Sequence, residues 1–400
     1  MITYARKNIL LQSRINFLSG VVFLIPLITL FYKYTGLSLG QIIIITNVST
    51  LAVWLFELPT SVWADTAWRK KALVASVVCN FIGALLILLV PSYIWFIIAS
   101  IFSGLYFAFW SGTGQAFLED NLRILWEEST FGKKIGHLMA MESLAGLITP
   151  LIASAILKFF GDNGYTILAW LDVISALALV ILTLQLRELN IYEKLTWRKE
   201  SLRKNIDTAK IAIKNVMSNP SLRLLLIYRS LANHVAFIFI ISLPLRVQYG
   251  MPEWMAWVLA TVGTLAIMIA NKYTYKIGEK YSYNTAWVIA TVSQGILLIC
   301  IGLFIKDWII MSVLLIAFNM FEWMRQPAWN HVLVEQTQGK AIATTRSIIF
   351  SLFALYTTFG KQVLSFFDPQ YALVGLGLFI LVVNIILWKK IIHLNINTHV

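Results

Sequence analysis

Long apolar stretches recur along the whole 400-residue chain, and they constrain its fold more than any other feature of the sequence. A helix that crosses the hydrocarbon core of a bilayer needs roughly 20 mostly apolar residues. Stretches of about this length lie at 15–32, 41–62, 72–90, 93–117, 136–158, 165–186, 222–246, 254–271, 284–305, 308–328, 342–365 and 371–389. A membrane β-barrel shows short alternating segments instead. We therefore predict an all-α, polytopic membrane protein with twelve transmembrane helices.

The charged residues set the expected orientation of these helices. Only 13% of residues are charged and 59% are hydrophobic, and the net charge is +13. In a soluble protein such a charge would suggest a nucleic-acid partner. With the N-terminus placed in the cytoplasm, however, the inner segments hold 26 of the 32 Lys and Arg residues and the outer loops hold five. The positive-inside rule then predicts a cell-membrane protein (plasma or inner membrane) with both termini cytoplasmic and no nucleic-acid partner.

One long polar interval divides the chain into two halves. We predict an N-terminal six-helix bundle over 1–186, a cytoplasmic linker over 187–221 and a C-terminal six-helix bundle over 222–400. The linker, together with Arg223, carries nine basic residues, and its apolar residues recur every three to five positions. This pattern fits either an amphipathic surface helix or a solvated connection. The segments Ile156–Asp162 and Val363–Pro369 are similar, which indicates two pseudo-symmetric halves.

The segment Glu57–Lys71, with the sequence ELPTSVWADTAWRKK, carries a family resemblance. It resembles the loop 2–3 signature E-x-P-T-G-x-x-A-D-R-x-G-R-K of bacterial members of the major facilitator superfamily. Asp65 and Arg69 match the signature. The departures from it are Ser61, Thr66 and Trp68, which replace a glycine, an arginine and a second glycine.

Two further segments resemble the same family, in patterns most familiar from its bacterial exporter-like members. Residues 104–122 resemble the span-four pattern G-L-x-x-x-F-x-S-G-x-x-E-A-x-x-x-D-S-L, with Gln115 in place of the glutamate. Residues 325–347 resemble R-Q-P-x-x-N followed by R-A-T-x-x-S, with Ile342 in place of the second arginine. The resemblance implies the family's two-bundle fold and secondary transport by alternating access.

The resemblance also implies roles for charged and polar residues. Asp65 and Arg69, with Glu57, would form a cytoplasmic latch or gate, although the same charges could lie in a solvated turn. Spans one, four, seven and ten would line the cavity. The cavity candidates are Asn16, Gln115, Arg229, His234 and Asn319, and the proton-coupling candidates are Glu322 and Glu142.

Simpler structural roles remain open for several of these residues. Glu322 and Arg325 stand three residues apart and could neutralise each other on one helix face. His234 could serve as a hydrogen-bonded structural residue. Asp172, on span six, would be peripheral in this family's architecture.

The leading functional hypothesis is proton-coupled efflux of amphipathic or drug-like compounds. A sugar or metabolite importer of the same fold and a non-transporting membrane sensor are the alternatives. The five histidines are dispersed, and no Gly-rich phosphate-binding loop is present, so we predict neither an enzyme nor a metal site. We expect a monomer in the lipid bilayer that binds a small-molecule substrate and uses an ion gradient, with the proton as the expected ion, in place of a cofactor.

Overall fold

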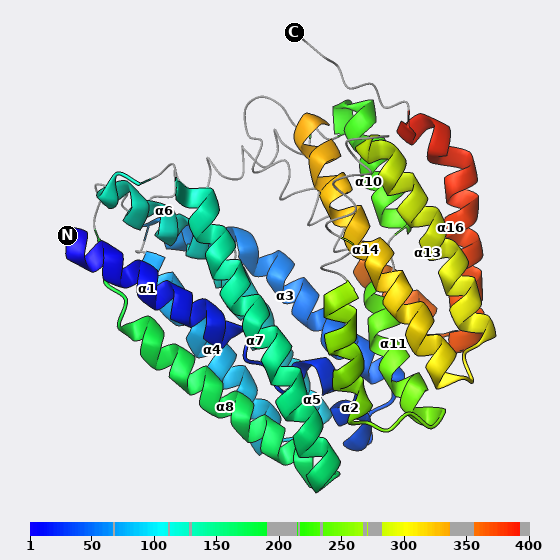
Figure 1. Ribbon diagram of the computed structural model, residues 1–400, viewed down its shortest axis with the longest axis horizontal. Helices are drawn as coiled ribbons and strands as arrows, with labels where there is room; N and C mark the ends of the chain where they lie inside the picture. The colour runs from blue at the N-terminus through cyan, green and yellow to red at the C-terminus, as the bar shows by residue number, and fades with distance from the viewer. Residues whose placement is uncertain are drawn as a thin grey trace. The chain divides into compact units, whose positions relative to one another are not determined.

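The computed structural model describes residues 1–66, 69–110, 113–127, 130–189, 214, 217–232, 235–266, 270, 282–336 and 356–392. Within these residues the regular secondary structure is helical throughout. The chain divides into two compact units, Met1–Leu202 and Arg203–Val400, and the boundary lies inside the polar interval 187–221 (Figure 1). Most of that interval lies outside the described residues, so its amphipathic helix and the exact bounds of the bundles stay predictions.

The first unit contains the helices that the first six apolar stretches predict. They are α1 (Ile2–Ser19), η1 (Ile25–Leu27), α2 (Ile28–Tyr34), α3 (Leu39–Thr66), α4 (Arg69–Leu89), α5 (Tyr93–Trp110), α6 (Thr113–Leu125), α7 (Phe131–Phe160) and α8 (Asn163–Leu184). In a bilayer each backbone N–H and C=O must find a partner within the protein, which explains why apolar sequence takes the helical form. Helix α8 packs against both α1 and α4 (Figure 1).

The second unit contains the corresponding later helices. They are α10 (Pro220–Ala232), α11 (Val235–Gln248), Met255–Ala266, α13 (Tyr283–Leu303), α14 (Trp308–Gln336), 356–364 and α16 (Pro369–Ile392). Across the described part of both units, eight helices are long and apolar enough to cross a membrane, and two more are shorter apolar helices. The similar segments Ile156–Asp162 and Val363–Pro369 each lie where one helix ends and the last helix of its unit begins, after α7 in the first unit and after 356–364 in the second.

Glycines allow several helix pairs to meet backbone to backbone. A Cβ atom placed on Gly104 of α5 would lie 2.7 Å from the carbonyl oxygen of Ser49 on α3. On Gly377 of α16 it would lie 2.6 Å from the carbonyl oxygen of Gly295 on α13. Helices in lipid gain no hydrophobic driving force from contact with each other, so close packing of small residues supplies the attraction.

The first span departs from the prediction, because it is not one continuous helix. Helix α1 begins far before residue 15 and ends at Ser19, and residues 20–24 are irregular before η1 and α2. The backbone amides of Phe23 and Leu24 donate to the Asp172 carboxylate on α8, at 2.6 and 2.8 Å. The carboxylate replaces the intrahelical acceptors that these amides lose, so the break is satisfied inside the protein. Asp172 thus contacts the first span, and its predicted peripheral place in the two-bundle fold stays a prediction.

Candidate functional site

A buried charged group lies in the second unit, and we name Arg229, Gln294, Glu322 and Arg325 the α14 cluster. Glu322 and Arg325 stand three residues apart on α14, on one helix face. Their side chains are 8% and 4% exposed, and Arg325 Nη2 lies 2.6 Å from Glu322 Oε2. Gln294 Nε2 on α13 donates to the same oxygen at 2.9 Å. The ion pair that the sequence offered as one alternative is therefore present.

Arg229 brings a second positive charge to this pair. It lies on α10, is 6% exposed, and interacts with both the Glu322 carboxylate and the Arg325 guanidinium. An arginine stays protonated in proteins, so two guanidinium groups and one ionised carboxylate give the cluster a net charge of +1. Charged groups within a membrane span are costly and mark functional sites. This arrangement suits a ligand group that is anionic or accepts hydrogen bonds.

Neighbouring polar contacts hold α10 in place beside the cluster. The Tyr228 hydroxyl donates to Asn384 Oδ1 on α16 at 2.5 Å, and the Tyr228 ring meets the Trp287 ring of α13 edge to face. Asn384 Nδ2 in turn donates to the carbonyl oxygen of Ile380. The sequence analysis missed Gln294, Tyr228 and Asn384. The one sequence feature that could have indicated these three residues is that each is polar and lies in an otherwise apolar stretch.

The loop 2–3 segment forms a charged network inside the first unit. Arg69, the first residue of α4, places Nη1 2.6 Å from Asp120 Oδ2 on α6 and 2.5 Å from the carbonyl oxygen of Ala116. Glu188 Oε2, just after α8, accepts the Lys70 amide at 2.7 Å and so caps the start of α4. Burial raises the pKa of Glu188, against the lowering effect of these amide hydrogen bonds.

Arg69 is therefore bound within its own unit, and its predicted role as a latch stays a prediction. Asp65 lies in the last turn of α3, and its side chain is outside the described set. Asp120 is the aspartate of the span-four pattern in residues 104–122, but the pattern did not identify it as the partner of Arg69, and nothing in the sequence indicated Glu188.

The other predicted residues lie on separate helices. In the first unit Glu57 is half-buried on α3, Gln115 is exposed on α6, Glu142 is exposed on α7 and Asn16 is buried on α1. In the second unit Asn319 is half-buried on α14, three residues before Glu322 and thus on a similar face. His234 lies outside the described residues. Of the predicted candidates, the structure brings Arg229 and Glu322 together.

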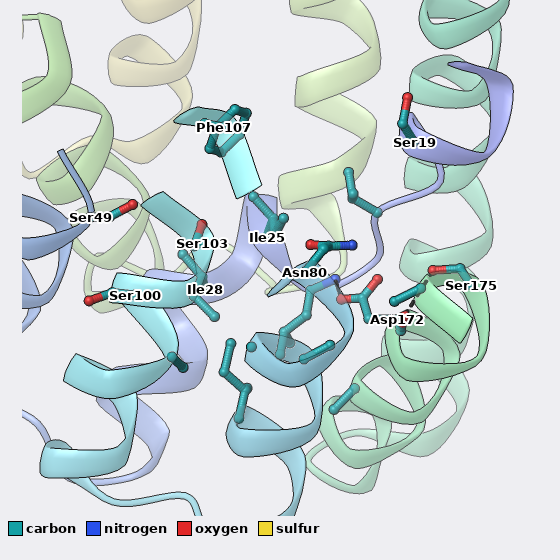
Figure 2. A pocket seen from close by; sticks show the side chains of 18 of the residues that line it. Ser19, Ile25, Ile28, Ser49, Asn80, Ser100, Ser103, Phe107, Asp172 and Ser175 are labelled. Atoms are coloured by element: carbon teal, nitrogen blue, oxygen red, sulfur yellow. Dashed lines mark hydrogen bonds between the residues drawn. The ribbon is translucent and has the colours of Figure 1, made fainter. Parts of the chain in front are cut away.

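The first unit also contains a partly open cavity of about 250 Å³. Its lining comes from the broken first span and from α3, α4, α5 and α8, and it is mostly apolar with several hydroxyl groups. Figure 2 shows the polar side chains at its wall, among them Asn80 of α4 and Asp172 and Ser175 of α8. No sequence pattern indicated this cavity, because its lining combines segments that are far apart in the chain.

Comparisons with known proteins agree with this architecture. No curated protein sequence matches the chain. Among solved structures, the nucleoside transporter NupG matches with a TM-score of 0.74 at 13% identity, over 98% of this chain and 100% of that one. A D-xylose-proton symporter matches with a TM-score of 0.70 at 13% identity, over 96% and 98%. A POT family transporter in complex with 5-aminolevulinic acid matches with a TM-score of 0.73 at 14% identity, over 96% of each chain.

These matches show a shared fold: an all-α membrane protein of two six-helix halves. The names of these matching structures do not support the expected exporter-like subgroup or drug efflux. A family model described as the Major Facilitator Superfamily matches residues 13–361, which is most of the sequence. The chain therefore belongs to the Major Facilitator Superfamily, a family of transporters that span the membrane many times.

Proposed function

We propose that this chain takes up a small polar solute across the cell membrane by alternating access, driven by a proton gradient. The observation that carries the proposal is the α14 cluster, in which three charged side chains lie buried, two of them on α14, whose segment Trp308–Arg325 is apolar and long enough to cross a membrane. Its net positive charge favours a solute with a carboxylate or other acceptor group over a cationic drug. The nucleoside, D-xylose and 5-aminolevulinic acid in the names of the matching structures are polar solutes of this kind.

The cluster also suggests how a proton and an anionic solute could bind together. With Glu322 ionised, Arg325 is held by its carboxylate at 2.6 Å. If Glu322 takes up a proton, the charge of the cluster rises from +1 to +2, and Arg325 becomes available to the solute. An anionic solute then binds more tightly to the protonated state, and by reciprocity the bound solute favours protonation. Because the solute and the proton bind together, they cross the membrane in the same direction.

Orientation in the membrane follows from the charge distribution. The excess of Lys and Arg on the inner segments supports cytoplasmic termini and a place in the cell membrane. We propose that the chain works there as a monomer with no cofactor.

Transport by the full chain in proteoliposomes tests the proposal. An inward proton gradient is imposed, and uptake of labelled 5-aminolevulinate, uridine and D-xylose is measured beside proton entry reported by an internal pH dye. We expect gradient-dependent accumulation of at least one solute, with proton entry on its addition and loss of both with a protonophore. Uptake that does not depend on the proton gradient would refute the proposed proton coupling.

Arg229→Gln should reduce the uptake at least tenfold, because it removes the charge that anchors the solute. Arg223→Gln is the matched control, since Arg223 is exposed on the same helix α10. Efflux competes with uptake because residues 104–122 resemble exporter-like members. Ethidium extrusion from loaded vesicles, with none of the polar solutes accumulated, would overturn uptake in favour of efflux. No flux of any of the four compounds by folded protein would overturn the proposal.

A further inference from the structure

The cavity inside the first unit lies wholly within one helix bundle, and the proposed function does not use it. Its wall includes Ile25 and Ile28 of the broken first span, Ala84 of α4 and Ala176 of α8. An apolar protein cavity of roughly 150 Å³ takes up benzene. At the same volume per atom, a cavity of about 250 Å³ has room for about ten non-hydrogen atoms. The space therefore suits a small organic molecule rather than a bare ion.

Asp172 gives this cavity its charge. Of the described residues that line it, Asp172 is the one with a formally charged side chain, and the lining includes no Lys, Arg or His. The two carboxylate oxygens accept one backbone amide each, from Phe23 and Leu24. A carboxylate has about four lone-pair sites, so each oxygen keeps a further acceptor position. The side chain is half-buried, so part of it remains accessible.

The hydroxyl groups around Asp172 leave this acceptor capacity in place. Ser175 donates to the backbone carbonyl oxygens of Val21 and Asp172 rather than to the carboxylate. Ser100 and Thr46 donate to carbonyl oxygens of their own helices. A negative charge at the wall of a low-dielectric space attracts a cation much more strongly than the same charge in water does.

The geometry points to a binding site for a small organic cation with an apolar body, held inside the first unit with its ammonium group against Asp172. The apolar side chains of the wall would enclose the body, and the carboxylate would select the charge. This site has the opposite sign to the α14 cluster, which suits an anionic or acceptor group. The inference is independent of transport, because binding is measured without a gradient.

2-Phenylethylammonium is a probe of suitable size, and propylbenzene is its uncharged isostere. Binding of each to the purified full chain in detergent is measured by equilibrium dialysis with a labelled compound. We expect saturable binding of the cation at one site and binding of the isostere at least tenfold weaker. Asp172→Asn should weaken cation binding at least tenfold, because it removes the charge.

A cavity-filling variant keeps the test decisive if Asp172→Asn fails to fold. Ala176→Leu adds bulk to the cavity wall and leaves the carboxylate unchanged, so it should abolish cation binding. Ala178→Leu is the matched control, because Ala178 is on the same helix and does not line the cavity; it should bind like wild type. Absence of saturable binding, equal binding of the isostere, unchanged binding in Ala176→Leu, or displacement of the probe by equimolar sodium ions would each overturn the inference.

Discussion

Replacing Glu322 with glutamine should strongly destabilise the second unit. The side chains of Glu322 and Arg325 are 8% and 4% exposed, and the atoms that pair them are 2.6 Å apart. Glutamine keeps the shape but removes the charge, so Arg325 loses its carboxylate partner while Arg229 still repels it. Removing one partner of a buried ion pair costs about 3–5 kcal/mol. We expect a loss of this size in the free energy of unfolding, measured by denaturation with SDS in mixed micelles.

Two variants separate this effect from a general effect of removing a glutamate. Glu119 and Arg123 form a pair at 3.3 Å with side chains 53% and 40% exposed, so Glu119→Gln should cost at most about 1 kcal/mol. Adding Arg325→Met to Glu322→Gln removes the second charge of the pair, and it should recover most of the loss. If Glu322→Gln unfolds at the same SDS fraction as Glu119→Gln, the electrostatic reasoning about the α14 cluster is refuted.

Three further outcomes follow from single contacts. Gly377→Ala should cost about 1–3 kcal/mol, because its Cβ would meet backbone on α13, whereas Gly375→Ala, with open space around it, should be neutral; SDS denaturation compares them. The raised pKa of Glu188 means that the folded state holds this proton more tightly than the unfolded chain, so its contribution to stability falls as pH rises above its ordinary pKa of 4.5. Glu188→Gln should remove this dependence in unfolding curves between pH 4.5 and 7, and identical pH profiles would contradict it. Asp172→Ala should accelerate hydrogen exchange at the two amides of the first-span break relative to Ala178→Leu, and unchanged exchange would show that the carboxylate does not hold the break.

An ion pair between residues close in sequence could be predicted from the sequence, whereas an ion pair between residues far apart in sequence could not. The pairing of Glu322 with Arg325 follows from a three-residue spacing on any helix. Arg69 and Asp120 are 51 positions apart along the chain (69 to 120). Their contact depends on how α4 packs against α6. Apolar length likewise predicted the helices, because lipid forces long apolar segments into that form.

The break in the first span shows why hydropathy alone misses such features. Residues 20–24 are as apolar as their surroundings, and Gly20 and Pro26 are the only local irregularities. What permits the break is a carboxylate almost 150 positions later in the sequence. Its position could be known only after α8 had been packed against α1. The cavity beside the break could not be predicted for the same reason, because its wall also depends on how distant helices pack.

The glycine contact between α13 and α16 has a mechanical consequence. Side chains between two helices can change rotamer and let the helices slide, but here backbone meets backbone at Gly377 and Gly295. A shift along either axis would drive carbonyl oxygens into Cα atoms. We therefore expect these two helices to move together during a transport cycle, so that bending or sliding within the second unit involves its other helices.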